Sequence, residues 1–436
     1  MYKKSIFLIS LVLLAVLAGS ASGQTIYNIN ISLVDSNIML GTAATHTQMV
    51  NKVISNDHGI FASYTTMTEL PQEWRLAQST DGGQTFNVVY SEFIYTNPPP
   101  LCTDVNNTIY ASASMAGVTT LKFYKFYEND YSNPVTSIIP EGSGSKKDMC
   151  FDAARNCCYV VNMWGQFVII DVETGSMVDC STIYATNPVT SIGPHYPHVR
   201  MDGYDNIHYV MRADDSSIGT TISTLHLMSR DGGLSWERFD GTAVSVPTYC
   251  DADSEADILT YGQGSQTNNM LYKNGKMHFF NMLYLQEAIY LRYDLATGYK
   301  DRDSSLQNNG KIRGETIVFQ DGGAGFFATD ESIPGSPLYL IGADTSNHIA
   351  CLASYDNGDT WHDFALSENP QPMYAPSGGS QLTADNAIVG IYTNIDVVES
   401  FRVDTPGPAD LSRDGLLNFR DVAVLTAEWL DTGIWP

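Results

Sequence analysis

The chain has 436 residues, of which 43% are hydrophobic and 11% aromatic, and its formal net charge at pH 7 is −25. This composition is sufficient for a sizeable apolar core in one large domain or two ordinary ones. The strongly acidic balance argues against nucleic acid and anionic lipid as partners. It leaves the ligand open, because a local basic pocket can lie inside an acidic body.

The first 23 residues have the pattern of a secretory signal peptide. Lys3 and Lys4 precede an apolar run over residues 6–18, and small residues follow at 19–23. The run is too short for a membrane span, no later stretch qualifies, and no Cys follows it as in a lipoprotein. We therefore expect a soluble bacterial protein that is secreted or displayed at the cell surface.

Seven cysteines follow, at positions 102, 150, 157, 158, 180, 250 and 351. An exported protein can form disulfides, but an odd number leaves at least one thiol unpaired. Cys150, Cys157, Cys158 and Cys180 are close enough in sequence for one local bridge. Buried free thiols, or a metal or redox role, are the alternatives, although the spacing fits no zinc pattern.

One phrase recurs three times along the chain. It is written STDGGQTF at 79–86, SRDGGLSW at 229–236 and SYDNGDTW at 354–361. Strand-like segments surround each copy, and comparable segments without the phrase occur between them, so a structural unit repeats. The units begin near residues 49, 101, 149, 199, 270, 316 and 381. Seven units of this length predict a β-propeller of seven blades, or six with another partition, and a spare strand at 27–33 could close the ring.

The three phrases resemble the Asp-box (BNR) repeats of sialidase-like β-propellers, and the resemblance covers most of residues 24–403. It implies an all-β fold in which the boxes lie on outer strand turns, away from the central axis. Asp81, Asp231 and Asp356 are then structural, since each carboxylate can accept bonds from backbone N–H groups of its own turn. Glycine provides the positive φ that such a turn needs.

The ligand site of a propeller is expected at the mouth of the central channel, where the innermost strands begin. The repeat alignment places Lys146 and other polar or basic residues there, which favours an anionic or sugar ligand. The catalytic candidates are His46, His195, His198, Arg200 and Arg313. The candidates for substrate binding are Lys147, Arg212, Asn268 and Asn269.

The stretch GPHYPHVRMDGYDNIHYVMR, residues 193–212, is the richest in these groups. Its arginines could bind a carboxylate through paired N–H contacts, and His or Tyr, including Tyr196, could act as general base or acid. The alternative is that His208 and Tyr209 are strand residues packed between blades and that Arg200 pairs with a surface acid.

A second candidate is DADSEAD, residues 251–257, in which acidic residues alternate. Asp253 and Glu255 could contact substrate or provide a general acid, and the run could also hold Ca²⁺ through oxygen ligands. A solvated acidic loop is the alternative interpretation.

The resemblance to sialidases implies three arginines on the substrate carboxylate, the first in an early Arg-Ile-Pro phrase. This chain lacks that phrase, and its first arginine is Arg75. Propeller polysaccharide lyases of similar repeat type use His, Tyr and Arg to neutralise a uronate and abstract its proton, which residues 193–212 could do. We expect a glycoside hydrolase or polysaccharide lyase acting on an anionic glycan. The alternative is a propeller that binds glycan or protein without catalysis.

The tail differs in composition from the rest. Residues 404–409 read as a Pro/Gly linker, and the spacing D-x-S-x-D-G-x-x-N-x-x-D after it is that of a calcium loop. The expected Ca²⁺ ligands are Asp410, Ser412, Asp414, Leu416 through its carbonyl, Asn418 and Asp421. With the apolar helix that follows, residues 410–436 resemble one repeat of a type I dockerin. A full dockerin has two repeats, so a cohesin-like or cell-surface partner is an expectation by resemblance only.

Overall fold

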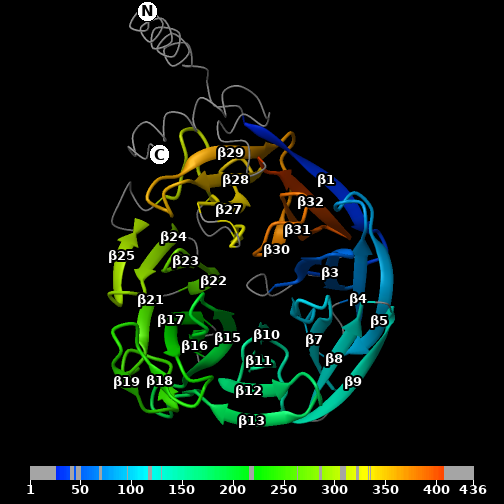
Figure 1. Cartoon of the computed structure of the whole chain (residues 1–436). Helices are drawn as coiled ribbons and strands as arrows, with labels where there is room; N and C mark the ends of the chain where they lie inside the picture. Colours follow the sequence, from blue (N-terminus) through cyan, green and yellow to red (C-terminus); the bar gives the residue numbers. More distant parts are fainter. Residues whose placement is uncertain are drawn as a thin grey trace, which may run out of the picture.

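The computed structural model describes residues 26–39, 44–45, 51–67, 71–95, 97–115, 120–128, 130–215, 220–262, 264–283, 287–304, 311–320, 324–331, 333 and 335–406, without the side chains of 266–268 and 282–287. Its strands form seven four-stranded blades around a central axis (Figure 1). The predicted all-β propeller is thus confirmed, with seven blades. The signal peptide, His46 and the calcium loop lie outside the described residues and stay predictions.

Each blade is an antiparallel meander that runs outward from the axis. The innermost strands are β2 (Val53–Asn56), β6 (Leu101–Thr103), β10 (Lys147–Asp152), β15 (Ile192–Met201), β22 (Ser265–Lys273), β26 (Gly325–Ala328) and β30 (Tyr374–Gly378). The second strands are β3 (Gly59–Thr65), β7 (Ile109–Ser114), β11 (Cys157–Asn162), β16 (Ile207–Asp215), β23 (Lys276–Leu283), β27 (Leu338–Ala343) and β31 (Ala387–Asn394).

The outer half of each blade follows the same order. The third strands are β4 (Gln72–Ser79), β8 (Thr120–Tyr127), β12 (Gln166–Asp171), β17 (Thr220–Ser229), β24 (Glu287–Asp294), β28 (Ile349–Ser354) and β32 (Val397–Asp404). The fourth are β5 (Asn87–Ile94), β9 (Asp130–Gly142), β13 (Met177–Thr182), β18 (Trp236–Glu237), β25 (Tyr299–Asp303), β29 (His362–Ser367) and β1 (Tyr27–Asp35). The fourth blade carries four further short strands: β14 (Tyr184–Ala185), β19 (Ala243–Val244), β20 (Thr248–Tyr249) and β21 (Asp257–Tyr261).

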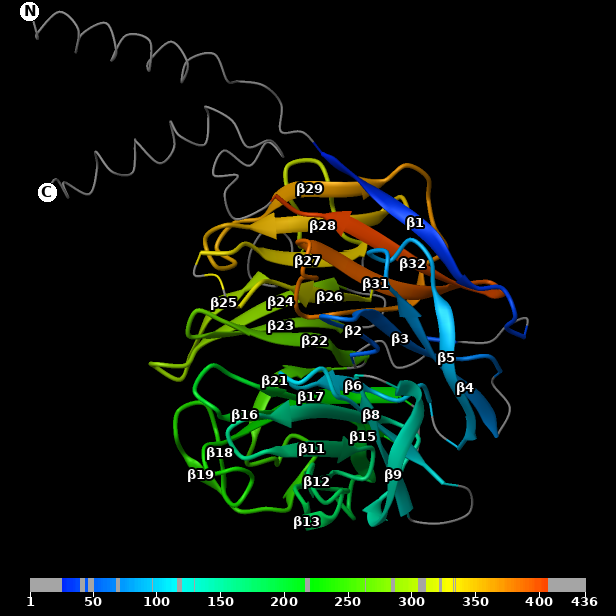
Figure 2. The same cartoon turned by 45° about the vertical axis from the view of Figure 1, so that its right-hand side comes forward.

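The first strand of the chain closes the ring. β1 pairs antiparallel with β32 of the seventh blade and parallel with β29 of the sixth. Both views show it lying along these two strands (Figures 1 and 2). Because the outer strand of the last blade comes from the N-terminal side of the chain, opening the ring requires breaking a sheet. The predicted closing strand is confirmed.

The apolar core lies between neighbouring blades rather than in one central mass. Trp74 of the first blade packs with Tyr124 and Phe126 of the second, with ring centroids 5.1 and 6.1 Å away. Second strands such as β7 and β11 are buried along their whole length, and even the serines that alternate with alanine in β7, Ser112 and Ser114, are buried. The inner strands of blades four, six and seven begin at 192, 325 and 374, and not near 199, 316 and 381 as the repeat alignment indicated.

The three recurring phrases form the turns that follow β4, β17 and β28, on the outer side of their blades. In the first, Asp81 Oδ1 accepts from Thr85 N at 2.9 Å and Oδ2 from Thr85 Oγ1 at 2.6 Å. Asp231 with Ser235 and Asp356 with Thr360 repeat the pattern. The predicted structural role of the three aspartates is confirmed. Asn357 stands at φ 59°, where the other turns have glycine, because Asn tolerates the left-handed region.

The inner strands begin on one face of the ring, which we call the front face. Backbone hydrogen bonds connect these starting points between neighbouring blades, from Leu101 N to Asn51 O at 2.8 Å and from Asn97 N to Ser145 O at 3.1 Å.

None of the described residues forms a helix with the length and hydropathy needed to cross a bilayer. All seven cysteines are among the described residues, and all are free thiols, so the local bridge considered from the sequence is not formed.

Candidate functional site at the front face

A bulge near the start of β15 places two ring side chains next to each other. Pro194 pairs with Ala213 and Tyr196 pairs with Arg212, so His195 is an extra residue in its strand. A bulge puts neighbouring residues on the same side of a strand and redirects their side chains. The rings of His195 and Tyr196 accordingly lie 4.6 Å apart, centroid to centroid.

Two cations and one carboxylate surround these rings. Arg212 lies opposite Tyr196 in the register, and its guanidinium carbon is 4.1 Å from the centre of the Tyr196 ring. Asp214, two residues further along β16, accepts from Arg212 Nε at 2.8 Å and Nη2 at 2.9 Å. Lys146, just before β10, holds its Nζ 5.1 Å from the same ring. We call these five residues, Lys146, His195, Tyr196, Arg212 and Asp214, the front cluster.

The carboxylate of the front cluster fixes the tautomer of its histidine. Burial by itself raises the pKa of Asp214, but hydrogen bonds and charges from His195 and Arg212 outweigh burial and hold that pKa well below its usual range. Asp214 is therefore ionised and can only accept hydrogen bonds. Its bond to His195 Nδ1 requires the hydrogen on Nδ1, so neutral His195 carries its lone pair on Nε2. Nε2 is then a base.

Tyr196 and Lys146 are both shifted by partial burial. Burial raises the pKa of Tyr196, with Arg212 lowering it and Asp214 and Tyr374 raising it, so the phenol stays protonated at neutral pH. Burial, together with the charge of Arg212, lowers the pKa of Lys146. No carboxylate of the described residues forms an ion pair with Lys146. Side-chain exposures of 27% for His195 and 15% for Arg212 leave the cluster accessible from solvent.

His198, three residues further along β15, has a different environment. Its Nδ1 bonds to Asp148 Oδ2 at 2.5 Å, and its Nε2 accepts from Met270 N at 3.2 Å. The side chain is 1% exposed. Burial and the charge of Arg200 together lower the pKa of His198 to about 4, although the charge of Asp148 acts in the opposite direction. Both ring nitrogens are bound by protein groups, so this geometry gives no support to the predicted catalytic role of His198.

Arg200 belongs to the same buried group. Its Nη1 donates to Asp148 Oδ2 at 2.7 Å and its Nη2 to Asn51 Oδ1 at 2.7 Å, which links blades one, three and four near the axis. Lys52 is also fully buried and interacts electrostatically with Asp148. We call Lys52, Asp148, His198 and Arg200 the axial cluster. The alternative interpretation of Arg200, pairing with a surface acid, is correct about an acidic partner but wrong about its place, because Asp148 is buried.

Two predicted substrate-binding residues also have protein partners. Lys147 is buried and directs Nζ to Ser114 Oγ at 2.6 Å and to the Gly144 carbonyl. Asn269 is 2% exposed, and its Oδ1 accepts from Phe327 N at 3.2 Å, joining blades five and six. Both therefore hold blades together in this structure. The side chain of Asn268 lies outside the described residues.

The acidic stretch 251–257 contains two kinds of residue. Asp251 is buried and accepts from Asn187 Nδ2 and Thr190 Oγ1, which fixes the turn that leads into β15. Asp253 and Glu255 are exposed, and Glu255 Oε2 accepts from Ser245 N at 3.3 Å. No three His, Cys, Asp or Glu side chains of the described residues are grouped to hold a metal ion, so a Ca²⁺ site in this stretch finds no support among them.

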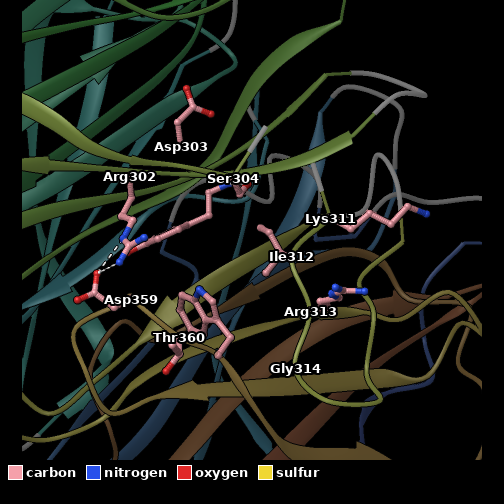
Figure 3. Close-up of a pocket in the computed structure, with 12 residues that line it drawn as sticks. Arg302, Asp303, Ser304, Lys311, Ile312, Arg313, Gly314, Asp359 and Thr360 are labelled. Atoms are coloured by element: carbon pink, nitrogen blue, oxygen red, sulfur yellow. Dashed lines mark hydrogen bonds and ion pairs between the residues drawn. The ribbon is translucent and has the colours of Figure 1, made fainter. Parts of the chain in front are cut away.

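Arg313 lies apart from the front cluster. It lines a pocket of about 240 Å³ between the outer parts of blades five and six, together with Arg302, Lys311, Asp359 and Trp361. Figure 3 shows Arg302 paired with Asp359 on one side of this pocket and Arg313 on the other. The sequence placed Arg313 at the start of an innermost strand, but residues 311–320 precede β26 and do not belong to it.

The structure thus brings together His195 and Arg212 of the predicted set and joins them to Lys146, Tyr196 and Asp214. Asp214 was not identified from the sequence. Its signal was present in Arg212-Ala-Asp214, since residues two apart on a strand share a face. Recognising that Asp214 contacts His195 requires knowing how β16 pairs with β15 at the bulge, which the sequence does not show.

Comparisons with known proteins bear on the fold. No protein-family model matches the chain, and no curated protein matches its sequence. Among solved structures, the chain is similar to an ulvan lyase, described as representing a new family of polysaccharide lyase and bound to -[GlcA(1-4)Rha3S]-. The identity is 11% over 85% of this chain and 94% of that chain, with a TM-score of 0.57.

A second similar structure is that of the polysaccharide lyase Uly1, with 7% identity over 87% of this chain and 92% of that chain and a TM-score of 0.52. At such identities the likeness concerns the propeller fold.

Proposed function

We propose that the protein is a polysaccharide lyase that cleaves a uronate-containing, anionic polysaccharide by β-elimination at the front cluster. The observation that carries this proposal is the arrangement of His195, held by Asp214, beside Tyr196 and two cations. It supplies a base, an acid and a positive charge within one accessible site. The two solved lyases of similar fold support the substrate class by analogy.

The chemistry follows from the groups present. Lys146 and Arg212 stabilise the uronate carboxylate, which makes the hydrogen on C5 more acidic. His195 Nε2 takes the C5 proton, and the electron pair left on C5 forms the C4=C5 double bond as the C4–O bond breaks. Tyr196 gives its phenolic proton to the departing oxygen, and solvent later restores it while His195 loses its proton. The product has one unsaturated uronate at its new non-reducing end.

Most glycoside hydrolases need two carboxyl groups that face the scissile bond, whereas sialidases use a tyrosine nucleophile. In the front cluster Asp214 is the one carboxylate, and it is already bound by both His195 and Arg212. The arrangement therefore favours elimination over hydrolysis by a pair of carboxyl groups.

The test is product analysis with purified protein on uronate-containing, sulfated and sialylated glycans. We expect an unsaturated uronate from at least one of them. His195→Ala and Tyr196→Phe should each lower kcat by about 10²–10⁴-fold, the range for general acid–base groups. His58→Ala is the matched control, because His58 also pairs with a carboxylate, Glu128, but lies in the turn after β2. Equal losses in the control and the cluster variants would contradict the assignment.

Export and calcium binding by residues 410–421 are further proposals that rest on the sequence. Calorimetric titration of Ca²⁺ into the full chain should detect one site that Asp414→Ala removes. No heat of binding in the unaltered chain would contradict the calcium proposal.

A further inference from the structure

The turn between β11 and β12 presents a tryptophan on the front face. Trp164 is 57% exposed. β11 ends where β10 begins, since Lys147 pairs with Asn162, so this turn lies at the same end of the ring as the front cluster. Tryptophan is highly buried on average in folded proteins, and it is enriched at binding interfaces.

The turn is held in one conformation. Asn162 is fully buried; its Oδ1 accepts from Trp164 N at 2.9 Å and from Gln166 N at 3.2 Å, and its Nδ2 donates to Ser143 O at 2.9 Å. Gly165 has φ 76°, and a Cβ there would lie 2.1 Å from the carbonyl oxygen of Tyr184. The backbone around Trp164 is therefore fixed before any ligand arrives, which lowers the entropy cost of binding.

The same turn contacts the backbone of the front cluster. Met163 N donates to Lys146 O at 3.0 Å. A Cβ at Gly144 would lie 3.4 Å from Trp164 Nε1, so the edge of the indole lies against residue 144, two positions before Lys146. Lys146 in turn reaches the Tyr196 ring. Residues 144–146, which are partly exposed, therefore connect the indole to the cluster.

We infer that Trp164 is a sugar-stacking platform that binds the pyranose ring next to the residue held by the front cluster. This inference rests on the proposed function, which places the uronate residue of the polysaccharide at the front cluster. The indole offers a flat apolar face and one N–H group, which suits the C–H face of a sugar and its hydroxyl groups. Lys146 and Arg212 bind the uronate residue, and the indole binds the neighbouring sugar. A ligand that uses both therefore contains at least two sugar residues.

The test compares Trp164→Ala and Trp164→Phe with unaltered protein, using oligosaccharides of increasing length prepared from the glycan that the protein cleaves or binds. Affinity is measured by calorimetry in a His195→Ala background, where loss of the base slows cleavage. We expect Trp164→Ala to weaken binding of the longer oligosaccharides about tenfold and Trp164→Phe to retain most of it. KM in active protein should rise in parallel, with a smaller change in kcat.

Tyr204→Ala is the matched control, because Tyr204 is a 65% exposed aromatic in the turn after β15, on the opposite face. Unchanged affinity in Trp164→Ala, or an equal loss in the control, would overturn the inference. Loss of binding in Trp164→Ala without any cleavage by unaltered protein would support the platform and reject the lyase. Absence of binding to every glycan tested would overturn both.

Discussion

Replacing Asp148 by Asn should destabilise the propeller strongly. Asp148 is fully buried, and Oδ2 accepts from His198 Nδ1, Val199 N and Arg200 Nη1. The amide has nearly the same shape but no charge, so the Arg200 guanidinium loses its buried carboxylate while staying out of water. Removing one partner of a buried ion pair costs about 3–5 kcal/mol, because the other charge is left uncompensated.

Urea unfolding followed by intrinsic fluorescence measures the loss, with Asp253→Asn as control. That substitution makes the same chemical change at an exposed position, and we expect it to alter the unfolding free energy by less than about 0.5 kcal/mol. The activity of folded Asp148→Asn should change much less than that of His195→Ala. Unchanged stability with lost activity would refute this reasoning, since it would place the axial cluster in the chemistry rather than in the closure of the ring.

Three further predictions concern the fold. Burial alone would raise the pKa of Asp148, but charges and hydrogen bonds from Arg200 and His198 outweigh burial and lower that pKa in the folded state. The ionised Asp148 should therefore stabilise the fold fully above about pH 4, and this stabilisation should be lost at lower pH. Measuring the unfolding free energy against pH in unaltered protein and in Asp148→Asn tests this. Gly233→Ala should cost more than Gly241→Ala in thermal melting, because both have positive φ but only at Gly233 would the Cβ lie 2.4 Å from the Phe167 ring; equal costs would contradict this explanation. Deleting β1 should abolish cooperative unfolding, since blade seven then lacks its outer strand; a deletion variant with an unchanged calorimetric transition would contradict the closing role of β1.

The architecture was readable from the sequence because its signals are local. A box such as STDGGQTF defines its own turn through Asp81 and Thr85, and an apolar run such as CCYVVN, residues 157–162, indicates a strand buried on both faces. The closing strand β1 followed from counting strands. The starts of three inner strands were displaced by several residues, since long connections between blades carry no periodicity that fixes where a strand begins.

The site was less readable because it depends on pairing between strands. The sequence cannot distinguish His195 from His198, three positions apart on one strand. His195 lies nearer the start of β15, is partly exposed and contacts Asp214, while His198 lies further along and contacts the buried Asp148. Arg313 was misplaced for a related reason, since residues 311–314 line a pocket with outer residues of blades five and six instead of beginning β26.

The most direct test of the central claim is ultraviolet detection of unsaturated uronate from a uronate-containing polysaccharide, comparing unaltered protein, Tyr196→Phe and His58→Ala. The account predicts product from unaltered protein and from His58→Ala, and a loss of about 10²-fold or more in Tyr196→Phe. A saturated product, or full activity in Tyr196→Phe, would contradict elimination at the front cluster.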